Sequence, residues 1–404
     1  MNKLKLTVCF LLVLCLTIGF VSCTKDSTNI ETDDNFSTTQ AVDDTTSNEL
    51  TEFLTFNKEY FSHYEWYEDS STMLVRSEYS DIKLDKSSAE KYPMLAKAIE
   101  ETSFSRKKTM EEEYQNFIAF ATDDFSDDAE AFTTYNSKLD VNVRRADSVA
   151  VSILEDYSTE SFRSLCGFNY DTESGKLLTL SEVVTDYSEI PSSIEKELMN
   201  RIGVEEPYGE TAVIDYFNNH SQEDIAWTLD YNGVTFWFDA GDIAPTNFGI
   251  QAVTVTFTEY PELFNKKYTL VSNEYIVGLP VSVPFFTDIK GDNATEEILV
   301  SGECVEDEKF YHTISISSEI SEYETDRFSY IEPYYVRTPD GNSYICIFSL
   351  INEEEGRNST LSVYELENGE VRLLGTSKTD LDYKGNNVYA FSTDPNSFIT
   401  SIKD

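Results

Sequence analysis

The stretch that determines the fold of the middle of the chain reads Ala226-Trp227-Thr228-Leu229-Asp230-Tyr231-Asn232-Gly233-Val234-Thr235-Phe236-Trp237-Phe238. Two runs rich in apolar and aromatic residues flank the pair Asn232-Gly233. An Asn-Gly pair between such runs is the strongest short-range signal of a β-hairpin, because both residues tolerate the positive φ of a tight turn. The sequence therefore predicts two antiparallel strands, residues 226–230 and 234–238.

The residues around this hairpin predict a small α+β module over residues 158–268. Ile190, Ile194 and Leu198 recur at helical spacing, which indicates an amphipathic helix around Pro191. The other expected elements are a hairpin (168–171 with 177–180), a third strand (251–257) and a short helix (259–267).

A second α+β module is predicted over residues 50–157. Pro93 suits the first turn of a helix, and the spacing of Met110, Tyr114, Phe117 and Ala121 indicates a helix with one apolar face. Alternating residues predict a strand pair within 72–85 and single strands at 135–145 and 148–157.

The remaining residues, 269–404, predict a β-rich module. Short alternating runs are separated by turn residues such as Pro339-Asp340-Gly341, and no run has a convincing helical period. The expected strands include residues 297–300, 313–317, 343–348, 361–365 and 371–374. The predicted fold class is α+β: two small α+β modules followed by a β-rich module.

The N-terminal residues indicate export. Lys3 and Lys5 precede an apolar run from Leu6 to Val21, which is typical of a secretory signal and too short to span a membrane as a helix. Phe20-Val21-Ser22-Cys23 resembles the lipobox of bacterial lipoproteins, in which the cysteine carries the lipid. We therefore expect a signal peptide over 1–22 and lipidation at Cys23. An acidic, disordered tether over 23–49 would follow, on a protein anchored to the cell membrane and facing outside the cytoplasm.

The charge balance restricts the partners. The chain has 74 Asp and Glu against 30 Lys and Arg, a net charge of −44. Nucleic-acid binding needs a basic surface, so nucleic acid is excluded as a partner. Two interpretations of the acidity remain open: solubility outside the cell, or attraction of a cationic partner such as a basic secreted protein or Ca²⁺.

A family resemblance covers the middle of the chain. The segments that carry it are 171–184, Trp227–Asp239, Asp242-Ile243-Ala244-Pro245, Val253-Thr254-Val255 and Glu259–Phe264. They resemble the extracellular domain of the anti-sigma-V factor RsiV and its relatives, and residues 50–157 resemble the module that precedes this domain in RsiV and in the deacetylase PdaC. The resemblance implies binding of an extracellular ligand, since RsiV binds lysozyme. An anti-sigma role is not expected, because no apolar run long enough to span a membrane follows Cys23.

The chain shows no catalytic motif, and we expect it not to be an enzyme. His63, His220 and His312 lie far apart without metal-ligand spacing and are expected as dispersed surface residues. Residues 286–298 resemble an Asp-rich Ca²⁺ loop in which Asp288, Asp292 and Glu296 would supply oxygens. Ca²⁺ at this loop is the one cofactor considered. Cys304 and Cys346 could form a disulfide, although buried free thiols are favoured.

The expected function is therefore that of a non-catalytic, lipid-anchored envelope lipoprotein that binds an extracellular ligand. The ligand would be a basic secreted protein such as lysozyme, or a wall component. Two alternatives stay open. One is a glycan- or peptidoglycan-handling accessory module, since Tyr64, Trp66, Tyr67 and Trp237 could stack on sugar rings. The other is a Ca²⁺-binding envelope protein.

Overall fold

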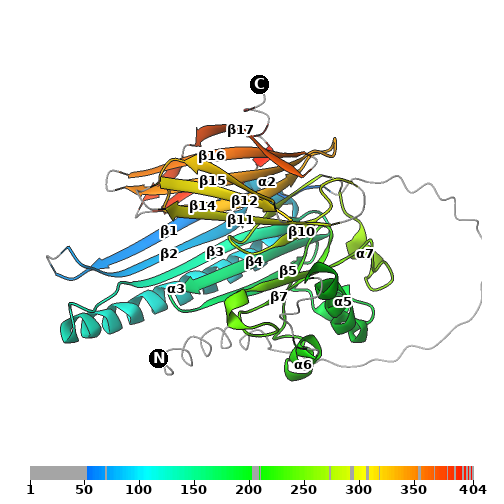
Figure 1. Ribbon diagram of the computed structural model, residues 1–404, viewed down its shortest axis with the longest axis horizontal. Coiled ribbons are helices and arrows are strands. Elements are labelled where there is room, and N and C mark those ends of the chain that lie inside the picture. Colours follow the sequence, from blue (N-terminus) through cyan, green and yellow to red (C-terminus); the bar gives the residue numbers. More distant parts are fainter. Residues whose placement is uncertain are drawn as a thin grey trace, which may run out of the picture.

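A computed structural model of the chain gives the fold (Figure 1). The structure describes residues 52–393 except 69–70, 203–208, 210, 273, 292–294, 306–308, 318, 354–355, 368, 380 and 386–387; beyond 393 it describes residues 395–396, 399 and 402 alone. The predicted class is confirmed: the fold is α+β, with a β-rich C-terminal part. No helix among these residues is long and apolar enough to cross a membrane.

A seven-stranded sheet forms the backbone of the molecule. Its strands, in spatial order, are β18 (Asp382–Gly385), β19 (Val388–Ser392), β1 (Phe56–Trp66), β2 (Met73–Leu84), β3 (Tyr135–Ala146), β4 (Ala150–Thr159) and β5 (Arg163–Asp171). Only β2 and β3 pair in parallel; the other neighbours are antiparallel. The parallel pair needs a long crossover connection, which the helices between these two strands provide.

The crossover consists of α2 (Lys86–Lys91) and α3 (Pro93–Asp127). The Asp85 side chain caps α2 by accepting a hydrogen bond from the backbone of Ser88, and Pro93 occupies the first turn of α3. The predicted apolar stripe is confirmed, since Met110, Tyr114, Phe117 and Ala121 are all buried against the sheet. The far end of α3 projects with β1 and β2 (Figure 1).

The strand pair predicted within residues 72–85 is wrong. These residues form the single strand β2, which pairs with β1 along its whole length. The segment is polar at its centre, but Ser77, Ser80 and Asp81 are buried within the strand. Their side chains bond Ser137, the backbone of Val141 and Arg106, so no turn is needed to expose them to water.

Two further sheets form the C-terminal part. The five-stranded sheet has the order β17 (Glu370–Thr379), β16 (Gly356–Glu367), β15 (Ser343–Glu353), β14 (Tyr330–Arg337) and β9 (Tyr275–Gly278). The four-stranded sheet has the order β10 (Phe285–Thr287), β11 (Glu296–Val305), β12 (Lys309–Ile316) and β13 (Glu319–Thr325).

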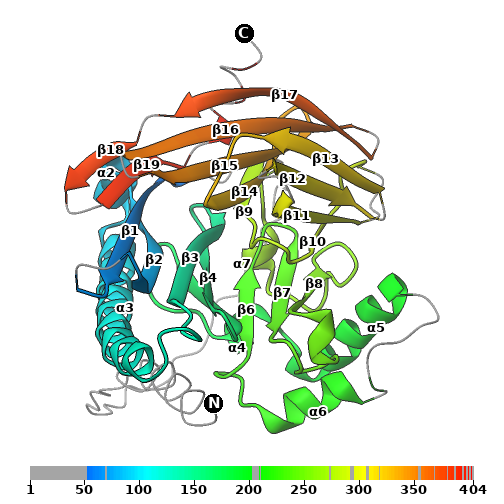
Figure 2. The ribbon, with the colours of Figure 1, turned by 60° about the vertical axis from the view of Figure 1, so that its left-hand side comes forward.

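The five-stranded sheet is the middle layer of three sheets, since its two faces pack on different sheets. In Figure 2 its strands β14 to β17 lie above β1 to β4, with β11 to β13 beside them. One of its faces packs Tyr335, Ile345 and Ile347 against Ile298 and Ile314 of the four-stranded sheet. Its other face packs a set of residues against β1 and β19 of the seven-stranded sheet; this set includes Tyr334, Val336, Phe348 and Val363. A sheet covered on both faces requires strands that are apolar on both faces, which explains the nearly continuous apolar run of β15.

The opening hairpin is confirmed as β6 (Ala226–Leu229) and β7 (Gly233–Phe238), to which β8 (Gln251–Thr256) adds a third strand. Helices cover this small sheet. They are α4 (Leu180–Val183), η1 (Tyr187–Glu189), α5 (Ile190–Ile202), α6 (Ala212–Asn219), η2 (Thr246–Phe248) and α7 (Lys266–Thr269). Apolar residues of these helices other than η2 form one core cluster together with β6, β7 and β8.

The helix predicted over residues 259–267 is wrong. Those residues form turns, and the helix α7 begins only at Lys266, where Asn265 caps it. Phe264 makes an isolated β-bridge with Val184 and lies in the core, which separates the turns before it from α7 after it.

Strand pairing crosses both expected module boundaries. β5 follows the boundary at 157/158 and pairs with β4, while β19 at the C-terminal end pairs with β1 near the start of the described chain. The division into three modules therefore stays a prediction. All three predicted modules contribute strands to the seven-stranded sheet. No disulfide joins the described cysteines Cys166, Cys304 and Cys346, as favoured, although Cys304 is exposed.

Two adjacent arginines join the seven-stranded sheet to the rest of the fold. Arg144 and Arg145 are both fully buried on β3. The Arg144 guanidinium binds Asp230 beside the hairpin at 2.5 and 3.1 Å and donates to the Gly278 carbonyl of β9 at 2.8 Å. Arg145 binds Asp147 at 2.9 Å and the Tyr268 carbonyl at 2.7 Å. Removing one partner of such a buried pair typically costs about 3–5 kcal/mol.

The close crossing of β5 and β6 yields the first prediction. A Cβ added at Gly167 would lie 1.8 Å from the Trp227 carbonyl oxygen, so the backbones would have to separate. We expect Gly167→Ala to lower the free energy of unfolding by about 1–3 kcal/mol or more, measured by urea titration. Gly209→Ala is the matched control, because its new methyl would meet nothing closer than 4.0 Å. Equal stability of the two variants would contradict the crossing.

Candidate functional site

A cluster of charged and phenolic side chains lies between the seven-stranded sheet and the five-stranded sheet; we call it the polar seam. It consists of Lys58 and Tyr60 of β1, Asp140 of β3, and Tyr330, Glu332 and Tyr334 of β14. The alternation of side chains along each strand places these residues between the two sheets. Residues 58 and 60 face the five-stranded sheet from β1, and residues 330, 332 and 334 face back from β14. Lys58 and Glu332 are each only 2% exposed.

Glu332 is the centre of the polar seam. Its Oε2 accepts hydrogen bonds from the Tyr60 hydroxyl at 2.5 Å and the Tyr334 hydroxyl at 2.9 Å. Its Oε1 forms an ion pair with Lys58 Nζ and lies 3.3 Å from the Tyr330 hydroxyl. Both carboxylate oxygens are therefore satisfied, as burial of this group requires.

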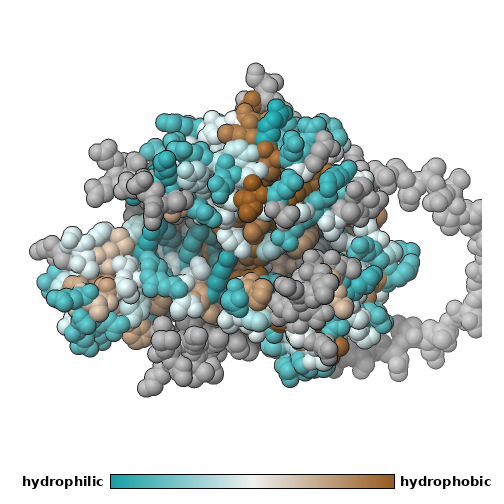
Figure 3. All heavy atoms as spheres, in the orientation of Figure 1, coloured by the Kyte–Doolittle hydropathy of each residue, from teal (hydrophilic) through white to brown (hydrophobic). Residues whose placement is uncertain are grey.

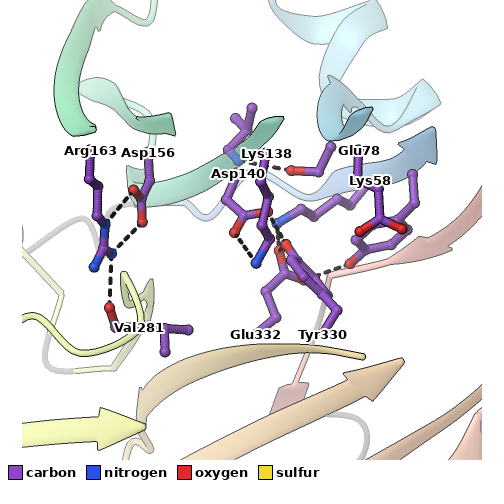
Figure 4. Close-up of polar contacts among 12 residues, drawn as sticks. Lys58, Glu78, Lys138, Asp140, Asp156, Arg163, Val281, Tyr330 and Glu332 are labelled. Carbon is purple, nitrogen blue, oxygen red and sulfur yellow. Dashed lines mark hydrogen bonds and ion pairs between the residues drawn. The ribbon is translucent and has the colours of Figure 1, made fainter. Parts of the chain in front are cut away.

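Asp140 forms the second half of the polar seam (Figure 4). Its Oδ1 accepts a hydrogen bond from the Tyr330 hydroxyl, and its Oδ2 pairs with Lys138 Nζ at 3.0 Å. The Lys138 ammonium also lies 3.7 Å from the centre of the Tyr330 ring. The Tyr330 hydroxyl is thus within hydrogen-bonding distance of both carboxylates and links them.

Burial sets the protonation of this cluster. Loss of hydration lowers the pKa of Lys58 from 10.5 to about 7; attraction to Asp140 opposes the shift and repulsion from Lys138 adds to it. The same loss raises the pKa of Tyr330 and of Tyr334 well above the usual value, so both hydroxyls remain hydrogen-bond donors. A neutral amine at Lys58 is therefore accessible near neutral pH.

A cavity of about 20 Å³ opens beside the polar seam, lined among others by Tyr60, Ser62, Glu78, Asp140 and Tyr330. Its size suits about one water molecule. Further along the same sheet face, Arg163 holds Asp156 with two bonds of 2.6 and 2.8 Å and donates to the Val281 carbonyl at 2.8 Å (Figure 4). The arrangement can hold charge and move protons, but offers no room for a larger ligand.

The residues expected as sites are not part of this cluster. Cys23 and Asp292 lie outside the described residues. Asp288 Oδ1 accepts from the backbone of Gly291 at 2.6 Å. Glu296 Oε2 accepts from the backbone of Ile289 at 2.9 Å, and its Oε1 pairs with Lys290 at 2.7 Å. No group of three His, Cys, Asp or Glu among the described residues is arranged to hold a metal. Ca²⁺ at this loop stays a prediction.

The expectation of three surface histidines is wrong for His312. This residue is fully buried, with Nδ1 3.0 Å from the Tyr364 hydroxyl and Nε2 2.9 Å from Ser349 Oγ. It lies on β12 at a position where alternation requires an inward side chain. His220 is exposed and His63 half-buried, so the three histidines do not converge.

A second hollow, of about 270 Å³, lies between α3 and strands β1 and β2. Phe104 on its rim is 72% exposed, and Glu59, Asp81, Lys83, Glu100, Ser103 and Lys107 supply most of the remaining lining. Among the aromatics considered for sugar stacking, Trp237 is buried and donates to Thr228 at 3.0 Å, whereas Trp66 is 45% exposed.

Sequence reasoning missed the polar seam because its members are far apart in the chain. A weak signal existed, because each charge lies on the same strand face as aromatic residues two positions away. Lys58 lies between Phe56 and Tyr60, and Glu332 lies between Tyr330 and Tyr334. A charge at an inward position predicts a buried partner, but not which one.

The molecule is thus an α+β protein with a β-rich C-terminal part. No protein-family model and no curated protein sequence matches it. The solved structures similar to it include a DUF3298 family protein from Bacteroides fragilis, at 13% identity and a TM-score of 0.42, covering 55% of this chain and 98% of that one. A DUF3298 family protein from Pseudomonas aeruginosa aligns at 14% identity and a TM-score of 0.35, covering 53% and 96%.

Buried His312 makes stability depend on pH. Burial lowers its pKa from 6.5 to about 4. Between these values the unfolded chain binds a proton that the folded chain does not, so stability falls as pH falls from 6.5 to 4. We expect urea titrations to show this loss, on the order of 3 kcal/mol from this residue by pH 4. The loss should be missing in His312→Gln and kept in the exposed control His220→Gln. Identical pH profiles for wild type and His312→Gln would contradict this.

Proposed function

We propose that this protein is a non-catalytic, lipid-anchored envelope protein that binds a cationic protein outside the cytoplasm. The supporting sequence features are the lipobox-like residues ending at Cys23, the RsiV-like pattern around Trp227–Phe264, and the net charge of −44. The observation that carries the proposal is the charge at one end of α3.

The distal arm, defined as residues 64–68, 71–75 and 114–128, projects from the rest of the molecule (Figure 1). Tyr67 in its β1–β2 connection packs on Phe125 of α3, with ring centres 4.5 Å apart. Trp66 and Phe120 are each 45% exposed there. Figure 3 shows hydrophilic side chains at the tip of the arm, interspersed with apolar ones.

The end of α3 in the distal arm is acidic where a helix favours basic residues. Asp123, Asp124 and Asp127 lie in its last turns, Asp128 caps it, and no basic residue offsets them there. No Lys or Arg occurs between Lys108 and Lys138. The C-terminus of a helix carries negative partial charge, so each such acid costs about 0.3–1 kcal/mol. A local cost of this kind is characteristic of a functional surface, and a cationic partner would remove it.

The charge proposal is tested by binding to lysozyme, a basic protein, in calorimetry at low and at physiological salt. Asp123, Asp127 and Glu130 are exposed and have no ion-pair partner among the described residues. We expect their triple change to Asn, Asn and Gln to weaken binding about tenfold, because each exposed charge contributes up to about 1 kcal/mol. The same variant should melt at a higher temperature, because the repulsion at the helix end is relieved.

The matched control removes three carboxylates elsewhere. Glu319, Glu322 and Glu324 are exposed on the edge strand β13, and changing all three to Gln alters net charge equally. Binding that is weakened only by the α3 variant, and by salt, supports the distal arm as the docking surface. Equal weakening of lysozyme binding by both variants would mean that net charge, and not the distal arm, determines binding. An absence of lysozyme binding at low salt would contradict the proposal for lysozyme.

A second candidate function, glycan binding, is favoured by the hollow at Phe104. An exposed aromatic ring suits the apolar face of a sugar, and the surrounding carboxylates, lysines and serine supply both donors and acceptors for hydroxyl groups. We expect Phe104→Ala to abolish any binding of soluble peptidoglycan fragments and to leave lysozyme binding unchanged. Fragment binding that survives this change would exclude the hollow as the glycan site.

A further inference from the structure

The polar seam contains the groups of an amide-forming reaction. Lys58 provides an amine, Glu332 a carboxyl group in contact with it, and Asp140 a second carboxylate linked to the first through the Tyr330 hydroxyl. Figure 4 shows the Lys58 side chain reaching toward Asp140 and Glu332. We propose that Lys58 Nζ and Glu332 Cδ join in an intramolecular isopeptide bond, with release of one water molecule.

The reaction needs a neutral amine and a neutral acid. Transfer of one proton from the Lys58 ammonium to the Glu332 carboxylate neutralises both groups, and burial lowers the cost of this transfer because it penalises both charged forms. The pKa of Lys58, lowered by burial to about 7, shows that its neutral form is readily reached. Near neutral pH the amine lone pair is then available for attack.

The hydrogen bonds around Glu332 match the charge that develops during attack. The Nζ lone pair forms a bond to Cδ, and the electrons of the carbonyl bond move to Oε2. The Tyr60 and Tyr334 hydroxyls already donate to Oε2 at 2.5 and 2.9 Å, so they stabilise the negative oxygen in the manner of an oxyanion hole.

Asp140 and Tyr330 complete the proton balance. The nitrogen becomes positively charged on attack and gives a proton to Asp140, whose attraction to Lys58 is part of the local electrostatics. Asp140 returns this proton through the Tyr330 hydroxyl to Oε1, 3.3 Å from that hydroxyl. The bond between Cδ and Oε1 breaks, the carbonyl re-forms at Oε2, and Oε1 leaves as water. One ammonium and one carboxylate thus become one amide and one water.

The surroundings favour the amide over its hydrolysis. Tyr60, Phe348 and Phe391 stack in the wall of the seam and, with the flanking sheets, limit access of water. Fixed contact between the two reacting groups corresponds to an effective concentration of about 10⁵–10⁸ M in well-oriented cases. The neighbouring cavity, with room for about one water molecule, can receive the product.

The bond would join the first long strand of the seven-stranded sheet to the middle sheet covalently. A link between residues far apart in sequence stabilises mainly by restricting the unfolded chain. The cross-link would therefore keep β1 and β14 together when other contacts are broken, which suits a protein outside the cytoplasm.

The test is a tryptic map of the full chain purified from cells and digested in denaturant. An amide at Lys58 blocks cleavage there, so residues 26–76 should appear joined to residues 328–337, one water lighter than the two peptides together. The result that overturns the proposal is a wild-type map dominated by separate peptides 26–58, 59–76 and 328–337. This readout needs no variant, so it does not depend on any substituted chain folding.

Variants then test the roles. Asp140→Asn removes the proton acceptor and should yield folded, unlinked chain, whereas Asp156→Asn on the neighbouring strand β4 should link as wild type does. Lys58→Met and Glu332→Leu should show no linked peptide. If Asp140→Asn formed the linked peptide to the wild-type extent, the relay through Asp140 would be overturned. If Lys58→Met still lost the mass of one water, the modification would lie elsewhere and the Lys58–Glu332 bond would be overturned.

Discussion

Lys58 and Glu332 lie face to face between the seven-stranded sheet and the middle sheet, both nearly out of reach of water. Taking two ions out of water costs several kcal/mol each, and only close pairing with further hydrogen bonds offsets that cost. Three tyrosine hydroxyls around Glu332 supply those bonds, and one of them, Tyr330, also donates to the Asp140 carboxylate. The register in which the middle sheet packs on β1 brings all of these groups together.

This constraint accounts for the order of the layers. The middle sheet is covered by the four-stranded sheet on one face and by the seven-stranded sheet on the other, with α3 beyond (Figure 2). β19 returns from the C-terminal end to pair with β1, next to the polar seam. The buried Arg144–Asp230 pair connects the same large sheet to the hairpin, and Arg145 connects it to α7 by donating to the Tyr268 carbonyl. Polar contacts thus orient layers that apolar packing alone would hold less specifically.

Local signals in the sequence predicted local structure well. Asn232-Gly233 determined a hairpin, and Pro93 with its apolar stripe determined α3, because turn chemistry and helical period act over a few residues. The failures arose where tertiary contacts decide. β2 stays one strand because its polar residues find buried partners. Residues 259–263 form turns and a bend instead of a helix, and Phe264 after them enters the core. The polar seam joins residues 58, 140 and 332, and no local pattern relates them. The acidic end of α3, by contrast, can be identified from the sequence once the bounds of the helix are known.

The account holds that the burial of Lys58 depends on Glu332, and a double-mutant comparison of unfolding free energies tests this most directly. Removing Glu332 alone leaves an amine without its partner, whereas removing both groups leaves an apolar seam. The account predicts that Lys58→Met/Glu332→Leu is more stable than Glu332→Leu by about 2 kcal/mol or more. A double variant no more stable than Glu332→Leu would contradict it.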